Sequence, residues 1–130
     1  MEFNYKYNCQ KCRKENNCIV NDKNVKKKFC YVGNTSLLVH LMKCEHCGVI
    51  NVVQVDNTDT NEKLKLLKTK IMMSADMDKG DMKKSEKIKL QKEIRSLSKN
   101  LDEMRKGLLK KYRKFFKKNL DMLESLWYNE

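Results

Sequence analysis

CQKC (residues 9–12) and CEHC (residues 44–47) are two cysteine pairs of the pattern CxxC, with 31 residues between them. A CxxC turn lets two thiolates converge on one ion, and two such turns complete the closed tetrahedral geometry of a structural zinc site. We therefore predict one structural Zn²⁺ bound by Cys9, Cys12, Cys44 and Cys47. Four thiolates leave the ion no open position and make it a poor Lewis acid, so we do not expect an enzyme.

The second pair is followed by Gly48 and by the strand-like stretch VINVVQV (residues 49–55). This arrangement resembles the zinc ribbon family, in which two such turns, or knuckles, are carried on hairpins of a small antiparallel sheet. In that family the glycine permits the left-handed backbone of the knuckle, and backbone amides point at the sulfurs. The first knuckle departs from this pattern, because Arg13 stands where glycine is common. The resemblance covers about 50 of the 130 residues and implies a fold but little about activity.

The metal is expected to hold this unit together. A 56-residue segment buries little apolar surface, so we expect metal removal to unfold it. The first residues lack a basic start followed by an apolar run, and no stretch approaches the length of a membrane span. We therefore expect a cytoplasmic protein whose thiols are reduced.

Two further cysteines and two histidines remain outside the predicted ligand set. Cys18 and Cys30 lie in apolar, strand-like settings, where a free thiol packs as a small hydrophobe. A second metal site using both with a histidine, or a disulfide between them, are the alternatives. His46 lies between two ligands and is read as a solvent-facing knuckle residue, although it could replace Cys44 or Cys47. His40 alternates with apolar neighbours and is read as a sheet residue.

The chain changes character near Asp56. All six cysteines and the β-favouring runs at residues 3–7, 36–42 and 49–55 come before it, and mainly helix formers follow. We predict an α+β protein with a zinc ribbon at residues 1–56, a short amphipathic helix and turn at 57–81, and a long basic amphipathic helix at 82–130.

The second half carries two helical patterns. Leu64, Leu67, Ile71 and Ala75 predict a short helix capped by Thr58 or Thr60, and residues 74–85 with Gly80 read as a turn. One long helix is predicted from about Lys84 to Tyr128. Its apolar residues recur with a period of 3.5, which suits helix packing or a coiled-coil seam, and they are Leu90, Ile94, Leu97, Leu101, Met104 and Leu108.

Two arrangements of these helices are open. The short helix can fold back as an antiparallel hairpin, or two long helices can pair between chains. We favour a combination, which leaves the distal aromatic end free to dimerise or to grip a partner.

Positive charge is concentrated at the end of the chain. The formal net charge is +12, of which residues 1–56 carry +4, residues 57–81 carry 0 and residues 82–130 carry +8. The lysine and asparagine bias also fits an A/T-rich genome, so charge alone does not indicate nucleic acid. Two basic clusters interleaved with aromatics are candidate partner-binding surfaces, namely Lys26, Lys27 and Lys28, and Lys106, Lys110, Lys111, Arg113, Lys114, Lys117 and Lys118. On the helix, the aromatic residues fall on a different face from the lysines. This indicates that the aromatic residues belong to the core and that the lysines form a stripe exposed to solvent.

Two functions remain open. The leading hypothesis is a small non-catalytic regulatory protein that binds nucleic acid or a nucleic-acid-processing enzyme. The alternative is a protein-interaction module, such as a phage or mobile-element inhibitor or adaptor, that acts through its helix and dimerisation. Lysine predominance makes any nucleic-acid binding backbone-directed and salt-sensitive. No membrane partner or small-molecule substrate is evident.

Overall fold

The protein has five strands followed by three helices in the parts that the computed structural model describes, residues 3–21, 23–77 and 83–129. The elements are β1 (Phe3–Asn8), β2 (Glu15–Val20), β3 (Lys26–Val32), β4 (Thr35–Lys43), β5 (Ile50–Asp56), α1 (Thr58–Met77), α2 (Lys84–Lys118) and α3 (Leu120–Tyr128). All strand pairings are antiparallel, in a two-stranded sheet β1–β2 and a three-stranded sheet β3–β4–β5. The predicted α+β class is confirmed.

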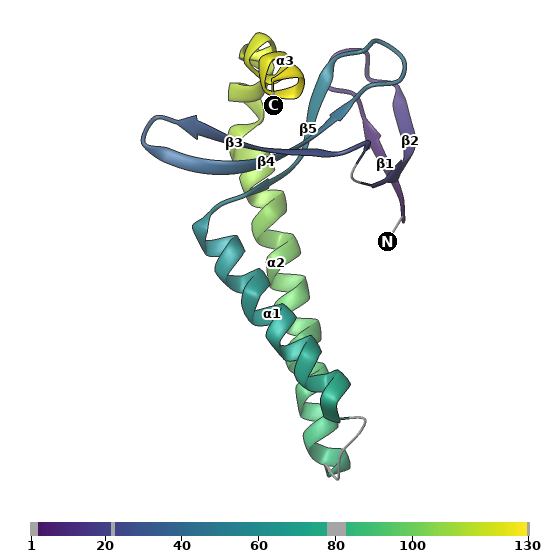
Figure 1. The fold of residues 1–130 in the computed structure, drawn as a ribbon, viewed down its shortest axis with the longest axis vertical. Coiled ribbons are helices and arrows are strands. Elements are labelled where there is room, and N and C mark those ends of the chain that lie inside the picture. Colours follow the sequence, from purple (N-terminus) through teal and green to yellow (C-terminus); the bar gives the residue numbers. More distant parts are fainter. Residues whose placement is uncertain (1–2, 22, 78–82, 130) are drawn as a thin grey trace.

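The main hydrophobic core lies between the three-stranded sheet and the end of the chain (Figure 1). Alternate residues of β4 point to this face, because side chains of a strand alternate between its two sides. Leu37, Val39 and Leu41 are 1% exposed or less. The buried members of the core come from β3, β4, β5, α2 and α3, and they are Cys30, Leu37, Val39, Leu41, Ile50, Val55, Phe116 and Leu123.

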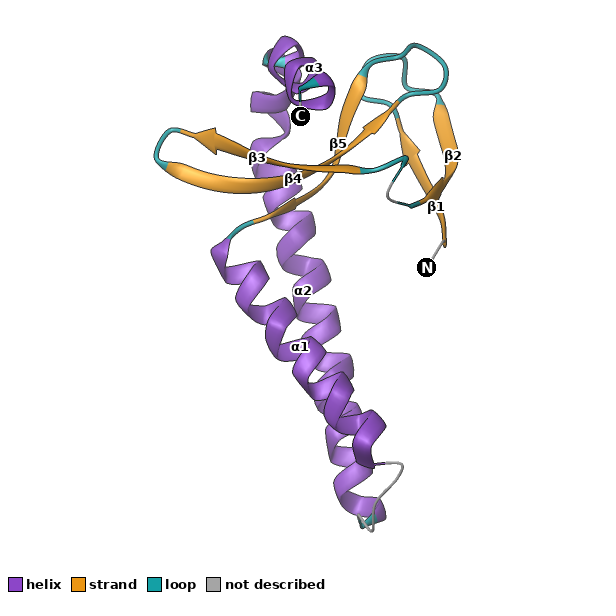
Figure 2. Ribbon diagram, in the orientation of Figure 1, coloured by secondary structure: helices purple, strands orange, loops and turns teal. Residues whose placement is uncertain are grey.

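The first helix folds back along the second. In Figure 2, α1 and α2 form an antiparallel hairpin that extends away from the sheet, which is one of the two arrangements that the sequence left open. Leu67 of α1 and Leu90 and Leu101 of α2 are buried along this hairpin. Among the other four predicted packing residues, Ile94, Leu97, Met104 and Leu108 are partly buried. Part of the predicted turn, residues 78–82, lies outside the described residues.

The start of α1 differs in detail from the expectation. The capping residue is Asn57, whose Oδ1 accepts a hydrogen bond from the Thr60 amide at 2.9 Å. Thr60 Oγ1 in return accepts one from the Asn57 amide at 2.8 Å. This reciprocal pair satisfies donors that a helix start otherwise leaves free. Thr60 is therefore a partner in the cap and not the cap itself.

The single long helix predicted for residues 84–128 is wrong at its distal end. Asn119 interrupts it with φ −123° and ψ 44°, and its backbone N–H bonds to the Phe116 carbonyl. The Asn119 side chain also donates to the Phe115 carbonyl at 2.7 Å. These bonds end α2 and let α3 turn across the sheet, as Figure 1 shows.

The expectation of a free aromatic end is also wrong. Phe116 is 1% exposed and Leu123 is 0% exposed, because both pack against the three-stranded sheet. Beyond Leu108, the residues Leu109, Tyr112 and Phe115 also pack on this core, so the apolar face of α2 widens where it meets the sheet. The lysine stripe nevertheless behaves as expected, since Lys106, Lys110 and Lys117 are exposed.

The β1–β2 hairpin stands beside this body and contributes no residue to its buried core (Figure 2). Within residues 4–20, only Cys9 and Asn16 are buried. Both belong to the cysteine cluster described below. The hairpin is therefore attached to the rest of the protein chiefly through that cluster.

No described helix combines the length and the apolar character that a membrane crossing requires.

Candidate metal centre

The four predicted ligand cysteines lie together at the tips of two hairpins. Their Sγ atoms are all within 4.8 Å of one another, and the Cys9–Cys47 and Cys12–Cys44 sulfur pairs are each 3.6 Å apart. A tetrahedral ion with metal–sulfur bonds of about 2.3 Å requires sulfurs about 3.8 Å apart. The cluster is thus compatible with one metal ion. It is the only such group among the residues that the structure describes.

The two knuckles have the same backbone design. In the first, the Cys9 carbonyl accepts from the Arg13 amide at 2.9 Å, and the Cys9 amide donates to the Lys14 carbonyl at 3.0 Å. In the second, the Cys44 carbonyl accepts from the Gly48 amide at 3.0 Å, and the Cys44 amide donates to the Val49 carbonyl at 2.8 Å.

Backbone conformation also matches between the knuckles. Gly48 has φ 78° and Arg13 has φ 62°, so both knuckles use the left-handed region. Arg13 adopts it as a non-glycine residue, where the conformation is unfavourable by about 1–2 kcal/mol. Arg13 thus differs from Gly48 in residue type and not in backbone conformation.

Two buried asparagines that the sequence interpretation missed tie the knuckles together. Asn51, on β5, accepts from the Gln10 amide at 2.9 Å and donates to Cys9 Sγ at 3.5 Å. Asn16, on β2, accepts from the Glu45 amide at 2.9 Å and donates to Cys44 Sγ at 3.4 Å.

Each hairpin thus supplies the asparagine that completes the other hairpin's knuckle. Asn16 follows Cys12 by the same number of residues as Asn51 follows Cys47. The signal in the sequence is therefore a repeated CxxCxxxN pattern. Buried polar side chains at 2% and 3% exposure need such partners, which explains why both positions are asparagine.

The surroundings of the sulfurs favour thiolates at the buried end. Burial raises the pKa of the Cys44 thiol, but N–H donors from Cys47, Asn16 and His46 outweigh this effect and lower the pKa to about 6. At Cys12 the Lys14 amide lowers the pKa, while burial and the neighbouring cysteines raise it, with a net value of about 11. Four adjacent thiolates repel one another, so a cation between them would stabilise the charged form.

The remaining cysteines do not join the cluster. Cys30 is buried in the core, with its sulfur 3.9 Å from Met122 Sδ. Cys18 lies on β2 with its thiol 3.8 Å from the Tyr5 carbonyl oxygen. Both are free thiols, in agreement with packing, and the structure joins them neither in a disulfide nor in a second metal group within its described residues.

The two histidines have structural surroundings. His46 is exposed, and its Nε2 lies 3.0 Å from the Glu15 carbonyl oxygen. His40 lies in the sheet with its Nε2 3.0 Å from Asp56 Oδ2. Arg105 of α2 binds the other Asp56 oxygen at 2.8 Å.

Asp56 is therefore the centre of a buried charged network that joins sheet to helix. Burial raises the pKa of its carboxyl, but hydrogen bonds from His40, Arg105 and Gln54 outweigh this and hold the pKa well below its ordinary value. The carboxylate is 2% exposed, so its partners are needed to offset the loss of water.

The structure divides the first predicted basic cluster between two faces. Lys26 and Lys28 donate to the carbonyls of Trp127 and Asn129, at 2.8 and 2.7 Å. They thereby cap the C-terminus of α3, where cations are favourable. Lys26 also lies 4.6 Å from the centre of the Trp127 ring. Lys27 points to the opposite face of the sheet and is exposed.

The helical basic cluster is exposed along α2. The structure places Lys106, Lys110, Lys111, Arg113, Lys114, Lys117 and Lys118 there, all exposed. Arg113 and Lys117 differ from the others because they border a cavity that reaches the first knuckle.

Comparisons with protein-family models, with curated proteins and with solved structures found no match for the chain.

Proposed function

We propose that the protein is a non-catalytic, zinc-stabilised module that binds single-stranded nucleic acid on the outer face of the β3–β4–β5 sheet. The observation that carries this proposal is the exposure of two aromatic rings on β3. Phe29 and Tyr31 are 68% and 70% exposed. The two rings are neighbours on one face of the strand, and a contiguous exposed apolar patch of this kind is typical of an interaction site.

The two rings share one face because they alternate along the strand. Lys26, Lys28 and Cys30 point to the helices, so Lys27, Phe29 and Tyr31 point away from them. Nucleobases stack on exposed aromatic side chains with about 1–3 kcal/mol per base, and a neighbouring lysine neutralises phosphate. This combination supports binding of unpaired bases, whose faces a duplex would hide.

Charge supports contacts to the backbone more than to particular bases. The chain carries a formal net charge of +12, and its basic residues are mainly lysine. Arg105, one of only four arginines, is already bound to Asp56. Since bidentate reading of guanine prefers arginine, we expect weak sequence preference and a strong dependence on salt.

The donor set supports both the choice of zinc and a non-catalytic role. Four cysteine sulfurs at tetrahedral spacing are soft ligands typical of structural zinc, and the resemblance to zinc ribbons supports the same ion. A saturated thiolate site offers no position for water or substrate. The ion then holds the two hairpins together and takes no part in a reaction.

Fluorescence anisotropy with a labelled single-stranded oligonucleotide at low salt tests the proposal. We expect Phe29→Ala with Tyr31→Ala to weaken binding tenfold or more, since each stacked base contributes about 1–3 kcal/mol. A matched control, Met72→Ala with Ile88→Ala, removes two exposed apolar side chains from the helical hairpin and should leave binding unchanged. Equal affinities for the two double variants, or no binding by the wild type, would contradict the proposal.

A second candidate function is protein interaction through the helical hairpin. Leu66, Ile71, Met72 and Met73 of α1 are 43–68% exposed, although large apolar side chains normally seek cover. A nuclease-treated sample that is dimeric by light scattering, and becomes monomeric with Leu66→Ser and Met73→Ser, would favour this candidate. A wild-type monomer would exclude the dimeric form of it.

A further inference from the structure

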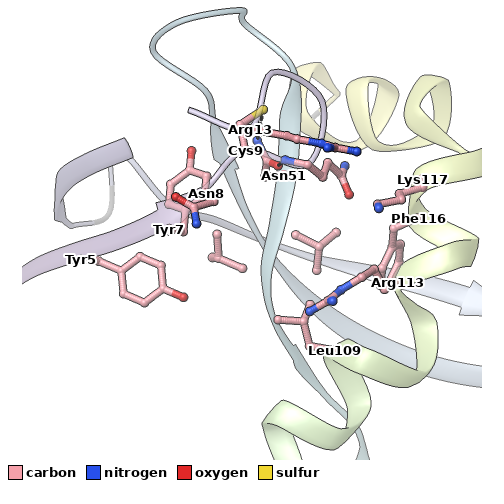
Figure 3. A pocket seen from close by; sticks show the side chains of 13 residues that line it. Tyr5, Tyr7, Asn8, Cys9, Arg13, Asn51, Leu109, Arg113, Phe116 and Lys117 are labelled. Carbon is pink, nitrogen blue, oxygen red and sulfur yellow. Dashed lines mark hydrogen bonds between the residues drawn. The ribbon is translucent and has the colours of Figure 1, made fainter. Parts of the chain in front are cut away.

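A cavity of about 380 Å³ separates the β1–β2 hairpin from the main body. Its walls come from β1, the first knuckle, β5 and α2, so it opens where the metal-linked hairpin faces the helix. Figure 3 shows Arg13 on the knuckle side, Arg113 and Lys117 on α2, and two tyrosine rings across the space from Arg113. Its volume falls in the range of about 300–1,000 Å³ that is typical of small-molecule sites.

The charged groups around this cavity are mainly cationic, although the Cys9 sulfur of the metal cluster also borders it. Arg13, Arg113 and Lys117 border it, and neither aspartate nor glutamate is among its described lining residues. None of the three cations forms an ion pair with a residue that the structure describes. Like charges brought to one space repel each other, and an anion between them removes that repulsion. Arginine and lysine together are the usual ligands of phosphate groups.

Arg13 provides an independent observation. Its backbone lies in the left-handed region, and the residue at the matching position of the second knuckle is Gly48. Glycine at this position would remove the strain without altering the cysteine geometry. A long cationic side chain at a strained backbone position that also lines a cavity supports a role in binding.

The tyrosine side of the cavity suits a flat ring. Tyr5 and Tyr7 lie with ring centroids 6.1 Å apart and planes inclined by 28°. The Tyr7 hydroxyl is buried and has no hydrogen-bond partner among the described residues. Because the Tyr7 hydroxyl is closed to solvent, the cavity offers a flat heterocycle the faces of these rings and not that hydroxyl.

We propose that this cavity binds a nucleoside monophosphate, with its phosphate against Arg13, Arg113 and Lys117 and its base against Tyr5 and Tyr7. The nucleotide can be free or the phosphorylated end of a strand, since both present the same group. The site lies on the helix side of the hairpin and does not use Phe29 or Tyr31. It is therefore independent of the function proposed above.

Isothermal titration calorimetry of the metal-loaded full chain with adenosine 5′-monophosphate tests the site. We expect this probe to bind more tightly than adenosine or inorganic phosphate, because only it occupies both halves of the cavity. Arg113→Gln with Lys117→Gln should lower its affinity about tenfold or more. The matched control, Lys110→Gln with Lys114→Gln, removes the same charge from the same helix outside the cavity and should leave the affinity unchanged.

Arg13→Gly separates binding from folding. We expect unchanged metal content and an equal or higher melting temperature, because strain is relieved, together with about tenfold weaker binding of the probe. Phe29→Ala with Tyr31→Ala should not affect the probe. Competition by a 5′-phosphorylated oligonucleotide would assign the site to strand ends, and its absence would assign it to free nucleotides.

Three results would overturn the proposal. They are equal binding of adenosine and the monophosphate, full affinity in Arg13→Gly, and equal losses in the two glutamine double variants, which would indicate only the general positive field.

Discussion

Removing the metal with a strong chelator is expected to release the β1–β2 hairpin while the rest of the protein stays folded. Every buried member of the main core belongs to β3, β4, β5, α2 or α3. The hairpin's own buried residues, Cys9 and Asn16, are parts of the cluster. This expectation differs from the interpretation from sequence, in which residues 1–56 unfold together, because β3, β4 and β5 share a core with α2 and α3.

The size of the effect follows from what remains after the ion is lost. Two cross-links from backbone amides persist, from the Gln10 amide to Asn51 and from the Glu45 amide to Asn16, each 2.9 Å long. Two further contacts add little, because the one between His46 Nε2 and the Glu15 carbonyl is exposed to water and the one from Gln10 Nε2 to the Ile50 carbonyl is 3.4 Å long. At about 1 kcal/mol each the two amide cross-links contribute about 2 kcal/mol, which corresponds to roughly 30-fold protection of an amide. A bound structural zinc ion contributes about 10–16 kcal/mol, and an isolated two-stranded hairpin is marginal on its own.

Hydrogen exchange measured residue by residue, with and without chelator, makes the comparison. Protection in β1 and β2 should fall to about 30-fold or less, while amides of β4, β5 and α2 keep most of theirs. Far-UV circular dichroism should retain its helical signal, since helices hold about half of the chain.

Cysteine variants supply matched controls. Cys12→Ser should reproduce the chelated state, whereas Cys18→Ser, on the same hairpin but outside the cluster, should retain one metal ion and full protection. Uniform loss of protection across the chain would refute the idea of two separately stabilised parts. Unchanged protection of β1 and β2 would refute the structural role of the metal.

Three further outcomes follow from particular contacts. Asn16→Ala should lower metal affinity about 10–100-fold in competition with a chromophoric chelator, and Asn17→Ala, on the exposed neighbour, should not. Asp56→Asn should destabilise the protein near neutral pH. Because the folded-state pKa of Asp56 is depressed, the contribution of its carboxylate to the free energy of unfolding is complete above the unfolded-state pKa of about 4 and is lost as the pH falls further. The difference between variant and wild type in urea unfolding should therefore shrink below about pH 4. Leu123→Ala should cost about 2–5 kcal/mol in the same assay, against little for Leu66→Ala, and a loss below 1 kcal/mol would argue against the packing of α3 on the sheet.

The sequence was informative wherever structure depends on neighbours along the chain. Metal-binding cysteines are recognised by their spacing along the chain, so all four residues of the sulfur cluster were predicted correctly. The two helical segments followed from apolar periodicity, which left open whether they pair within the chain or between chains, and the free thiols of Cys18 and Cys30 followed from their apolar surroundings. The repeated asparagines could also have been found, because Asn16 and Asn51 occupy matching positions after each cysteine pair.

The sequence was misleading where contacts join distant segments. The break at Asn119 depends on α3 finding the sheet, and helical periodicity alone carries no signal for it. Lys26 and Lys28 were predicted to bind a partner, but both donate hydrogen bonds to backbone carbonyls at the C-terminus of α3. Local charge cannot distinguish a lysine that binds a ligand from one that caps a helix within its own chain.

The exchanged asparagines also constrain the order in which the protein can be made. The ribosome synthesises the first knuckle well before Asn51, so the Cys9 sulfur and the Gln10 amide lack this hydrogen-bond partner during early synthesis. The second knuckle, in contrast, finds its partner Asn16 already synthesised. We therefore expect a nascent chain that ends before residue 51 to bind the metal more weakly than one that includes β5.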